Sequence, residues 1–202
     1  MNKENDRPFL EAFMEGVEAV YDLAADNEAV KAVPVVGTAF KFLKGLDDLR
    51  SRALQKKLFV FLSEPRLKSS AEARSMRQKI LIDQDKDAEI GQMLFLVLDK
   101  ITDNIKPVLL ARAYASYLDD VIDAITFEAI AHVIDMTFHR DLLSYLTSGR
   151  TIENHVDLWH QRIASAGLED VSEESWDGHR KYQDTPLGQV FKLAIKYEEI
   201  RR

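Results

Sequence analysis

The sequence predicts a mainly α-helical protein, in which a multi-helix bundle is followed by a small winged-helix-like unit with a two-stranded β-hairpin. Glycine and proline are scarce, with 8 and 5 among 202 residues. That is about half their usual combined share of ~12%, which argues against turn-rich all-β folds. Apolar residues recur three and four positions apart along most of the first 150 residues, which is the spacing of one helix face. An Asp-Gly pair at residues 177–178, between two short runs of alternating character, is typical of a hairpin turn.

Two helices are expected before the first polar linker. The first spans residues 8–26, and Asp6 can cap it because an aspartate before a helix accepts hydrogen bonds from the unpaired amides of the first turn. Pro34 interrupts the pattern because it has no amide hydrogen and restricts the residue before it. The second helix, residues 38–62, is longer and carries apolar residues at helical spacing.

The remaining helices of the predicted bundle follow a linker with a short helix over residues 66–89. A strongly apolar run predicts a buried helix over residues 90–101. Pro107 introduces another over residues 108–125, with Val121 and Ile125 among its apolar positions. The last helix of the bundle is expected to be capped by Thr126, to end at Gly149 and to turn one apolar face inward, made of Phe127, Ile130, Ile134, Phe138, Leu142 and Tyr145.

A second domain over residues 151–202 is expected after a first domain over residues 1–150. Its predicted elements are a helix over residues 153–166, strands over 168–175 and 179–183, and a last helix that begins at Thr185 and Pro186. Helix, hairpin and capped helix follow one another in this order at the end of a winged-helix domain.

Charge is distributed unevenly along the chain. There are 27 basic and 34 acidic residues, a net charge of −7, which disfavours a protein that binds nucleic acid with its whole surface. Residues 41–86 alone hold 12 basic and 6 acidic residues, a net charge of +6, between acidic segments. Such a segment is either a solvated face that pairs within the chain or a docking surface for an acidic partner protein or for the chain itself. The candidate partner-binding residues are Arg52, Lys56, Lys57, Arg66, Lys68, Arg74, Arg77 and Lys79.

The distribution of charge also bears on two alternative functions, membrane association and nucleic-acid binding. Residues 33–62 combine a continuous apolar face with a basic polar face, which fits a helix lying on a membrane surface as well as a core helix of a bundle. A winged-helix nucleic-acid-binding regulator is the other alternative. The predicted hairpin is mainly acidic, which opposes contact with phosphates.

The sequence carries neither a signal-peptide pattern nor an apolar run of the ~20 residues that a membrane-spanning helix needs. We therefore expect a cytoplasmic protein. It also holds no cysteine, which excludes disulfides, thiol catalysis and cysteine-bound metals.

Three polar clusters were considered as sites of chemistry, and a surface role is expected for each. Glu128, His132, Asp135 and His139 share one helical stripe, but one helix supplies only adjacent pairs of ligands to a metal ion. Asp119, Asp120 and Asp123 resemble an ordinary charged helix face more than a magnesium site. His155 and His160 flank Trp159 five residues apart, so their side chains diverge.

Motifs of known catalytic mechanics are also missing from the sequence. It contains no glycine-rich phosphate loop, no nucleophile elbow and no two-histidine zinc motif. The expected protein is therefore non-enzymatic, with no catalytic residues, no metal and no cofactor.

Several stretches resemble a group of largely uncharacterised small bacterial helical proteins. The resemblance lies in AVPVVG at residues 32–37, FLKGLDDLR at 42–50, KKLFVFL at 56–62, GQMLFLVLD at 91–99 and FHRDLL at 138–143. Residues 167–188 are similar to the C-terminal end of winged-helix domains. The resemblance implies a helical fold and a bacterial origin, and it suggests a protein-interaction module that is an accessory component of a stress or phage-defence system.

Overall fold

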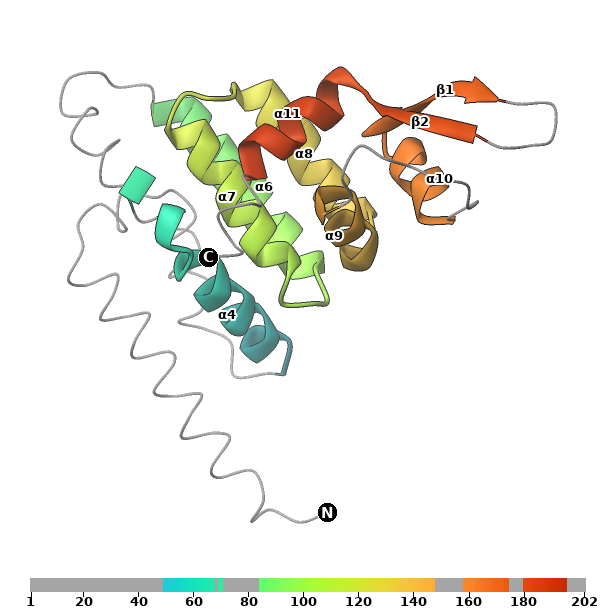
Figure 1. Cartoon of the computed structure of the whole chain (residues 1–202). Coiled ribbons are helices and arrows are strands. Elements are labelled where there is room, and N and C mark those ends of the chain that lie inside the picture. The colour runs from blue at the N-terminus through green and yellow to red at the C-terminus, as the bar shows by residue number, and fades with distance from the viewer. Residues whose placement is uncertain (1–48, 68, 71–83, 148–157, 175–179, 196–202) are drawn as a thin grey trace, which may run out of the picture. The chain divides into compact units, whose positions relative to one another are not determined.

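A computed structural model describes residues 49–67, 69–70, 84–147, 158–174 and 180–195 (Figure 1). These residues are mainly helical, with a two-stranded antiparallel hairpin near the C-terminus, so the predicted fold class is confirmed. The chain divides into two compact units, residues 1–100 and 101–202. The expected domain boundary at residue 150 lies inside the second unit. The predicted helix over residues 8–26, the break at Pro34 and the turn at residues 177–178 lie outside the described residues.

In the first unit, helix α4 (Leu49–Leu62) packs against helix α6 (Gln84–Lys100). The helix predicted to end near residue 62 does so, before Pro65. The apolar stripes of the two helices are buried, and they consist of Leu54, Leu58, Phe61 and Leu62 in α4 and Ile90, Leu94, Val97 and Leu98 in α6. Burial of these apolar side chains stabilises the packing of α4 on α6.

The second unit begins with helix α7 (Lys106–Leu118), whose Pro107 occupies the first turn, where no amide hydrogen is needed. The prediction that this helix continues to residue 125 is wrong. Asp119 follows its last residue, and Asp120 adopts a left-handed conformation with φ 58°, which turns the chain. Val121 and Ile125, predicted to be apolar core positions, are therefore exposed, Ile125 by 78%.

Helix α8 (Ala124–Met136) is capped by Asp123 and not by the predicted Thr126. The Oδ1 atom of Asp123 accepts a hydrogen bond of 2.8 Å from the backbone amide of Thr126. The sequence contains a good cap at either position, and the aspartate fits because Asp123 is the residue in extended conformation (φ −84°, ψ 174°).

The long helix predicted over residues 127–148 is also two helices. Thr137 leaves the helical conformation (φ −97°, ψ 144°), and helix α9 (His139–Thr147) begins two residues later. The break turns Phe138 outward, so its side chain is 68% exposed instead of lying in the core. The other five predicted core residues of this stretch, Phe127, Ile130, Ile134, Leu142 and Tyr145, are buried.

The C-terminal elements follow the predicted order of helix, hairpin and helix. They are helix α10 (Leu158–Ser165), strand β1 (Glu169–Glu174), strand β2 (Arg180–Asp184) and helix α11 (Pro186–Ile195). Thr185 caps α11 as predicted, because its Oγ1 atom accepts a hydrogen bond of 3.0 Å from the amide of Gly188.

Helix α11 joins the hairpin to the helices before it. It packs against α7 and α8, and the Oγ atom of Ser116 in α7 donates a hydrogen bond of 2.8 Å to the carbonyl oxygen of Ala194. Helix α10 packs against α9 and β1. The hairpin therefore stands on a base formed by α9, α10 and α11.

Candidate functional site

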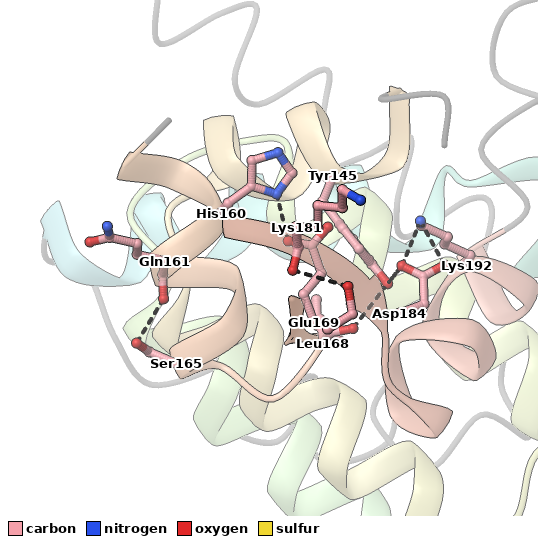
Figure 2. Close-up of polar contacts among 10 residues, drawn as sticks. Tyr145, His160, Gln161, Ser165, Leu168, Glu169, Lys181, Asp184 and Lys192 are labelled. Carbon is pink, nitrogen blue, oxygen red and sulfur yellow. Dashed lines mark hydrogen bonds and ion pairs between the residues drawn. The ribbon is translucent and has the colours of Figure 1, made fainter. Parts of the chain in front are cut away.

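The base of the hairpin contains a buried pair of ionisable side chains, His160 from α10 and Glu169 from β1. The Nδ1 atom of His160 lies 2.6 Å from Oε2 of Glu169, and the side chains are 3% and 6% exposed (Figure 2). The imidazole ring also stacks on two aromatic rings, with centroid distances of 3.5 Å to Trp159 and 4.9 Å to Tyr182. Residues from α10, β1 and β2 thus meet at His160.

A second polar cluster lies beside the first and surrounds Asp184, the last residue of β2. Its Oδ1 atom accepts hydrogen bonds of 2.9 Å from the hydroxyl of Tyr145 and 2.8 Å from Nζ of Lys192 (Figure 2). The same ammonium group lies 4.1 Å from the centre of the Tyr145 ring, where the ring's negative face attracts a cation. Asp184 lies directly opposite Glu169 in the hairpin, so one cross-strand residue pair contributes a side chain to each cluster.

Burial and hydrogen bonding shift the pKa values of two side chains of this site, Glu169 and Tyr145. Burial raises the pKa of Glu169, while the hydrogen bond with His160 opposes that shift. Burial and the hydrogen bond to Asp184 raise the pKa of Tyr145 well above its ordinary value. The phenol therefore stays a proton donor at neutral pH. The His160 side chain is closed off from solvent, so its contact with Glu169 fixes β1 on α10 at the base of the hairpin.

A glycine permits the close packing of α11 on this base. A Cβ atom on Gly188 would collide with the carbonyl oxygen of Leu168 and with the hydroxyl of Tyr145. The same region is held by Thr185, whose hydroxyl donates to the carbonyl oxygen of Gly167 at 2.6 Å and whose amide donates to that of Leu168 at 3.0 Å.

Helix α10, which carries His160, is itself fixed to α9 by an ion pair. The guanidinium of Arg162 donates two hydrogen bonds to the buried carboxylate of Asp141, one of them 2.8 Å from Nη2 to Oδ1. This paired arrangement has good geometry for an arginine and a carboxylate, and it raises the pKa of Arg162.

Beyond this base the two strands of the hairpin are largely open to solvent. Every residue of β1 after Glu169 is exposed, and the residues of β2 are exposed or half-buried. The charges on the two strands pair with each other, Lys181 with Glu173 and Arg180 with Glu174. Its acidic residues, which the sequence suggested would repel phosphates, are thus partly neutralised within the hairpin.

The eight basic residues predicted to bind a partner are only partly described. Lys56 is exposed in α4 and Arg66 is half-buried, while Lys57 is buried and donates a hydrogen bond of 2.8 Å to the carbonyl oxygen of Asp99. Lys57 therefore does not belong to an exposed basic surface, because its ammonium group pairs inside the first unit. Arg52 lies in α4, and the remaining residues, Lys68, Arg74, Arg77 and Lys79, lie outside the described residues.

The polar stripe considered for a metal is divided by the break after α8. Glu128 and His132 are exposed and Asp135 is half-buried in α8, whereas His139 begins α9 and lies 3.5 Å from Asp103. Among the described residues, no group of three or more histidine and acidic side chains is arranged to hold a metal ion.

The structure differs from the sequence predictions for two other polar clusters. The aspartates at 119, 120 and 123 form the turn between α7 and α8 and not a helix face. His160, expected on an amphipathic surface, is buried, whereas His155 lies outside the described residues. Glu169, Asp184 and Lys192, which the sequence did not predict as members of a site, belong to the two clusters at the base of the hairpin. Their spacing shows no motif, because their meeting depends on how the hairpin folds back.

Comparison of the chain with protein-family models, curated proteins and solved structures found no match. None of the helices in the described part of the chain is both long and apolar enough to cross a membrane.

Proposed function

We propose that this protein is a non-enzymatic protein-interaction module and that its C-terminal hairpin is the part that docks. The observation that carries the proposal is the contrast between the base of the hairpin and the rest of its two strands. Its base holds the buried pair of His160 and Glu169, while the strand residues beyond Glu169 are exposed in β1 and exposed or half-buried in β2. A two-stranded hairpin alone is only marginally stable in water. A buried anchor supports the proposal because it would hold an otherwise weak element in one orientation for a partner.

The test compares two exposed apolar positions in the full chain. Val171 lies in β1 and Ile125 in α8, and both are exposed apolar residues, so Val171→Glu and Ile125→Glu introduce the same charge on the hairpin and away from it. Proteins captured from a bacterial lysate by the immobilised chain are quantified by mass spectrometry. We expect a discrete set that is retained by Ile125→Glu and lost with Val171→Glu, while circular dichroism shows both variants folded. Equal capture by both variants would overturn the proposal.

The basic surface predicted for an acidic partner is a second candidate for docking. Lys56 is exposed, and Phe59, three residues later on the same face of α4, is also exposed. Aromatic side chains such as Phe59 are enriched at protein interfaces, and the lysine beside it would attract an acidic partner. Lys56→Glu is expected to weaken capture of an acidic partner at low salt, and unchanged capture would leave the hairpin as the only docking surface.

The setting that we propose is cytoplasmic, supported by a sequence without cysteine, which needs no oxidising compartment. The resemblance noted above adds a bacterial stress or phage-defence system as the biological context.

A further inference from the structure

We propose that the hairpin pairs with the hairpin of a second copy of this chain, along the outer edge of β2, to form a four-stranded antiparallel sheet. This inference rests on the proposed function, because it names the partner that the docking hairpin takes. Three observations support it: the outward backbone groups of β2, the protection of the outer edge of β1 against pairing, and the order of side chains along β2.

The first observation is the direction of the backbone groups of β2. The amide of Thr185 donates to the carbonyl oxygen of Leu168 at 3.0 Å, which makes these two residues a hydrogen-bonded pair. In an antiparallel ladder bonded and non-bonded pairs alternate, so the next bonded pair is Gln183 with Asp170. The backbone amides and carbonyls of Tyr182 and Asp184 consequently point away from β1. In the described part of the chain, no third strand pairs with them.

The second observation is that the outer edge of β1 is protected. The outward amide of Val171 is taken by Oδ1 of Asp170 at 2.8 Å, and a bulge interrupts the strand between Val171 and Glu173. Bulges and locally satisfied amides are devices that prevent a strand edge from pairing. Helix α10 also packs against β1. Strand β2 has no bulge, and its contacts with α9, α10 and α11 are made by the side chains of Asp184 and Tyr182 and by the helix that directly follows the strand.

The third observation is that the sequence of β2 complements itself. Its residues are Arg180, Lys181, Tyr182, Gln183 and Asp184. If two copies pair antiparallel about Tyr182, Arg180 lies opposite the partner's Asp184, and this pairing occurs twice. Lys181 then lies opposite Gln183 of the partner subunit, also twice. The outward backbone groups at residues 180, 182 and 184 bond in the same register. Within each chain Arg180 already pairs with Glu174 and Asp184 with Lys192, so the contact between the copies adds to existing ion pairs, and it places no like charges opposite each other.

Gln183 offers a pair of variants that separates this association from folding. Its side chain is exposed, and within its own hairpin it lies opposite Asp170. Gln183→Lys therefore adds an attractive pair inside each hairpin, but it places a lysine opposite Lys181 of the partner subunit. Gln183→Glu does the reverse, with repulsion inside the hairpin and attraction between the copies.

The experiment is sedimentation equilibrium of the full chain over a range of concentrations at low salt. We expect a monomer–dimer equilibrium in which Gln183→Lys raises the dissociation constant, and Gln183→Glu lowers it, each by about 2- to 30-fold for two cross-strand charge pairs. Urea titrations at a concentration where the chain is monomeric should order the stabilities of the two variants in the opposite sense. That order excludes loss of folding as the cause of weaker association.

Two outcomes would overturn self-pairing. One is a chain that stays monomeric at all concentrations up to about 1 mM, where even a weak dimer with a free energy near −4 kcal/mol is populated. The other is a dimer whose dissociation constant is the same in both variants, which would place the contact elsewhere. In either case capture that depends on Val171 would leave the proposed function standing, and capture independent of it would overturn that function separately.

Discussion

His160 and Glu169 join the last helix before the hairpin to the first residue of the hairpin, with 2.6 Å between Nδ1 and Oε2 and almost no exposure of either side chain. The contact bridges nine residues of sequence, and the chain between them turns at Gly167, which has a φ of 81°. A non-glycine residue at this φ would be strained. The pair therefore fixes both the position of β1 on α10 and the direction in which the hairpin leaves the base.

The first prediction is that removal of one partner of this pair is costly. His160→Ala leaves the Glu169 carboxylate buried without its partner, and breaking a buried pair in this way costs about 3–5 kcal/mol. The control is Lys181→Ala, which breaks the exposed pair with Glu173 and should cost about 1 kcal/mol or less. Urea denaturation measures both. Equal losses would mean that the buried contact is not the anchor of the hairpin.

The second prediction concerns pH. Burial raises the pKa of Glu169 above its ordinary value of 4.5, so the folded chain binds this proton more tightly than the unfolded chain. The contribution of Glu169 to stability is therefore fully present below pH 4.5 and is lost as the pH rises through the raised pKa. Glu169→Gln removes this titration but keeps an acceptor for His160. The free energy of unfolding of the wild type, relative to this variant, should decrease between pH 4 and pH 7, and an increase would contradict the assignment.

Local signals predicted the parts of the fold that depend on single residues. Pro65 follows the end of α4, Pro107 lies in the first turn of α7, and Thr185 caps α11, all as expected. A proline or a cap acts on the few backbone groups beside it, whatever the rest of the chain does. The hairpin was predicted for the same reason, from its turn residues.

Periodicity failed where the backbone breaks without a proline or glycine to mark it. The apolar pattern continues through Thr137, so Phe138 was placed in the core although it is exposed. The site was missed for a different reason. Tyr145 and Asp184 are 39 residues apart, and their hydrogen bond exists only because α9 and the end of β2 pack together. No local spacing contains that information.

The third prediction tests the corrected cap of α8. The hydrogen bonds from Thr126 lower the pKa of Asp123, so this residue stabilises the folded chain above its ordinary pKa and loses that effect as the pH falls through the lowered value. Asp123→Ala should destabilise the chain at pH 7, and the difference from wild type should shrink below pH 3.8. Glu128→Ala, an exposed change within the same helix, is the control. A difference that is constant with pH would mean that the carboxylate is not the cap.

The fourth prediction distinguishes two adjacent lysines of the basic segment. Lys57→Ala removes a buried hydrogen bond to the carbonyl oxygen of Asp99 and should lower stability by about 1–3 kcal/mol. Lys56→Ala changes an exposed side chain and should stay within about 0.5 kcal/mol of wild type. Thermal and urea denaturation of the two variants measure the difference. If Lys57→Ala leaves the stability unchanged, the buried hydrogen bond of Lys57 does not contribute to folding. Lys57 would then again be a candidate residue of the basic docking surface.

The fifth prediction concerns the close approach of α11 to the hairpin base. Gly188→Ala adds a methyl group that collides with the carbonyl oxygen of Leu168 and the hydroxyl of Tyr145, and one of these atoms belongs to the backbone. Overpacking of this kind costs about 1–3 kcal/mol, and the rigid backbone contact favours the upper end. Gln189→Ala, the next residue and an exposed one, gains helix propensity and should not destabilise. The added methyl group should also displace the Tyr145 hydroxyl and weaken its hydrogen bond with Asp184. Hydrogen exchange of the backbone amides in β2 should therefore accelerate more in Gly188→Ala than in Gln189→Ala. Equal exchange rates would show that α11 does not hold the hairpin.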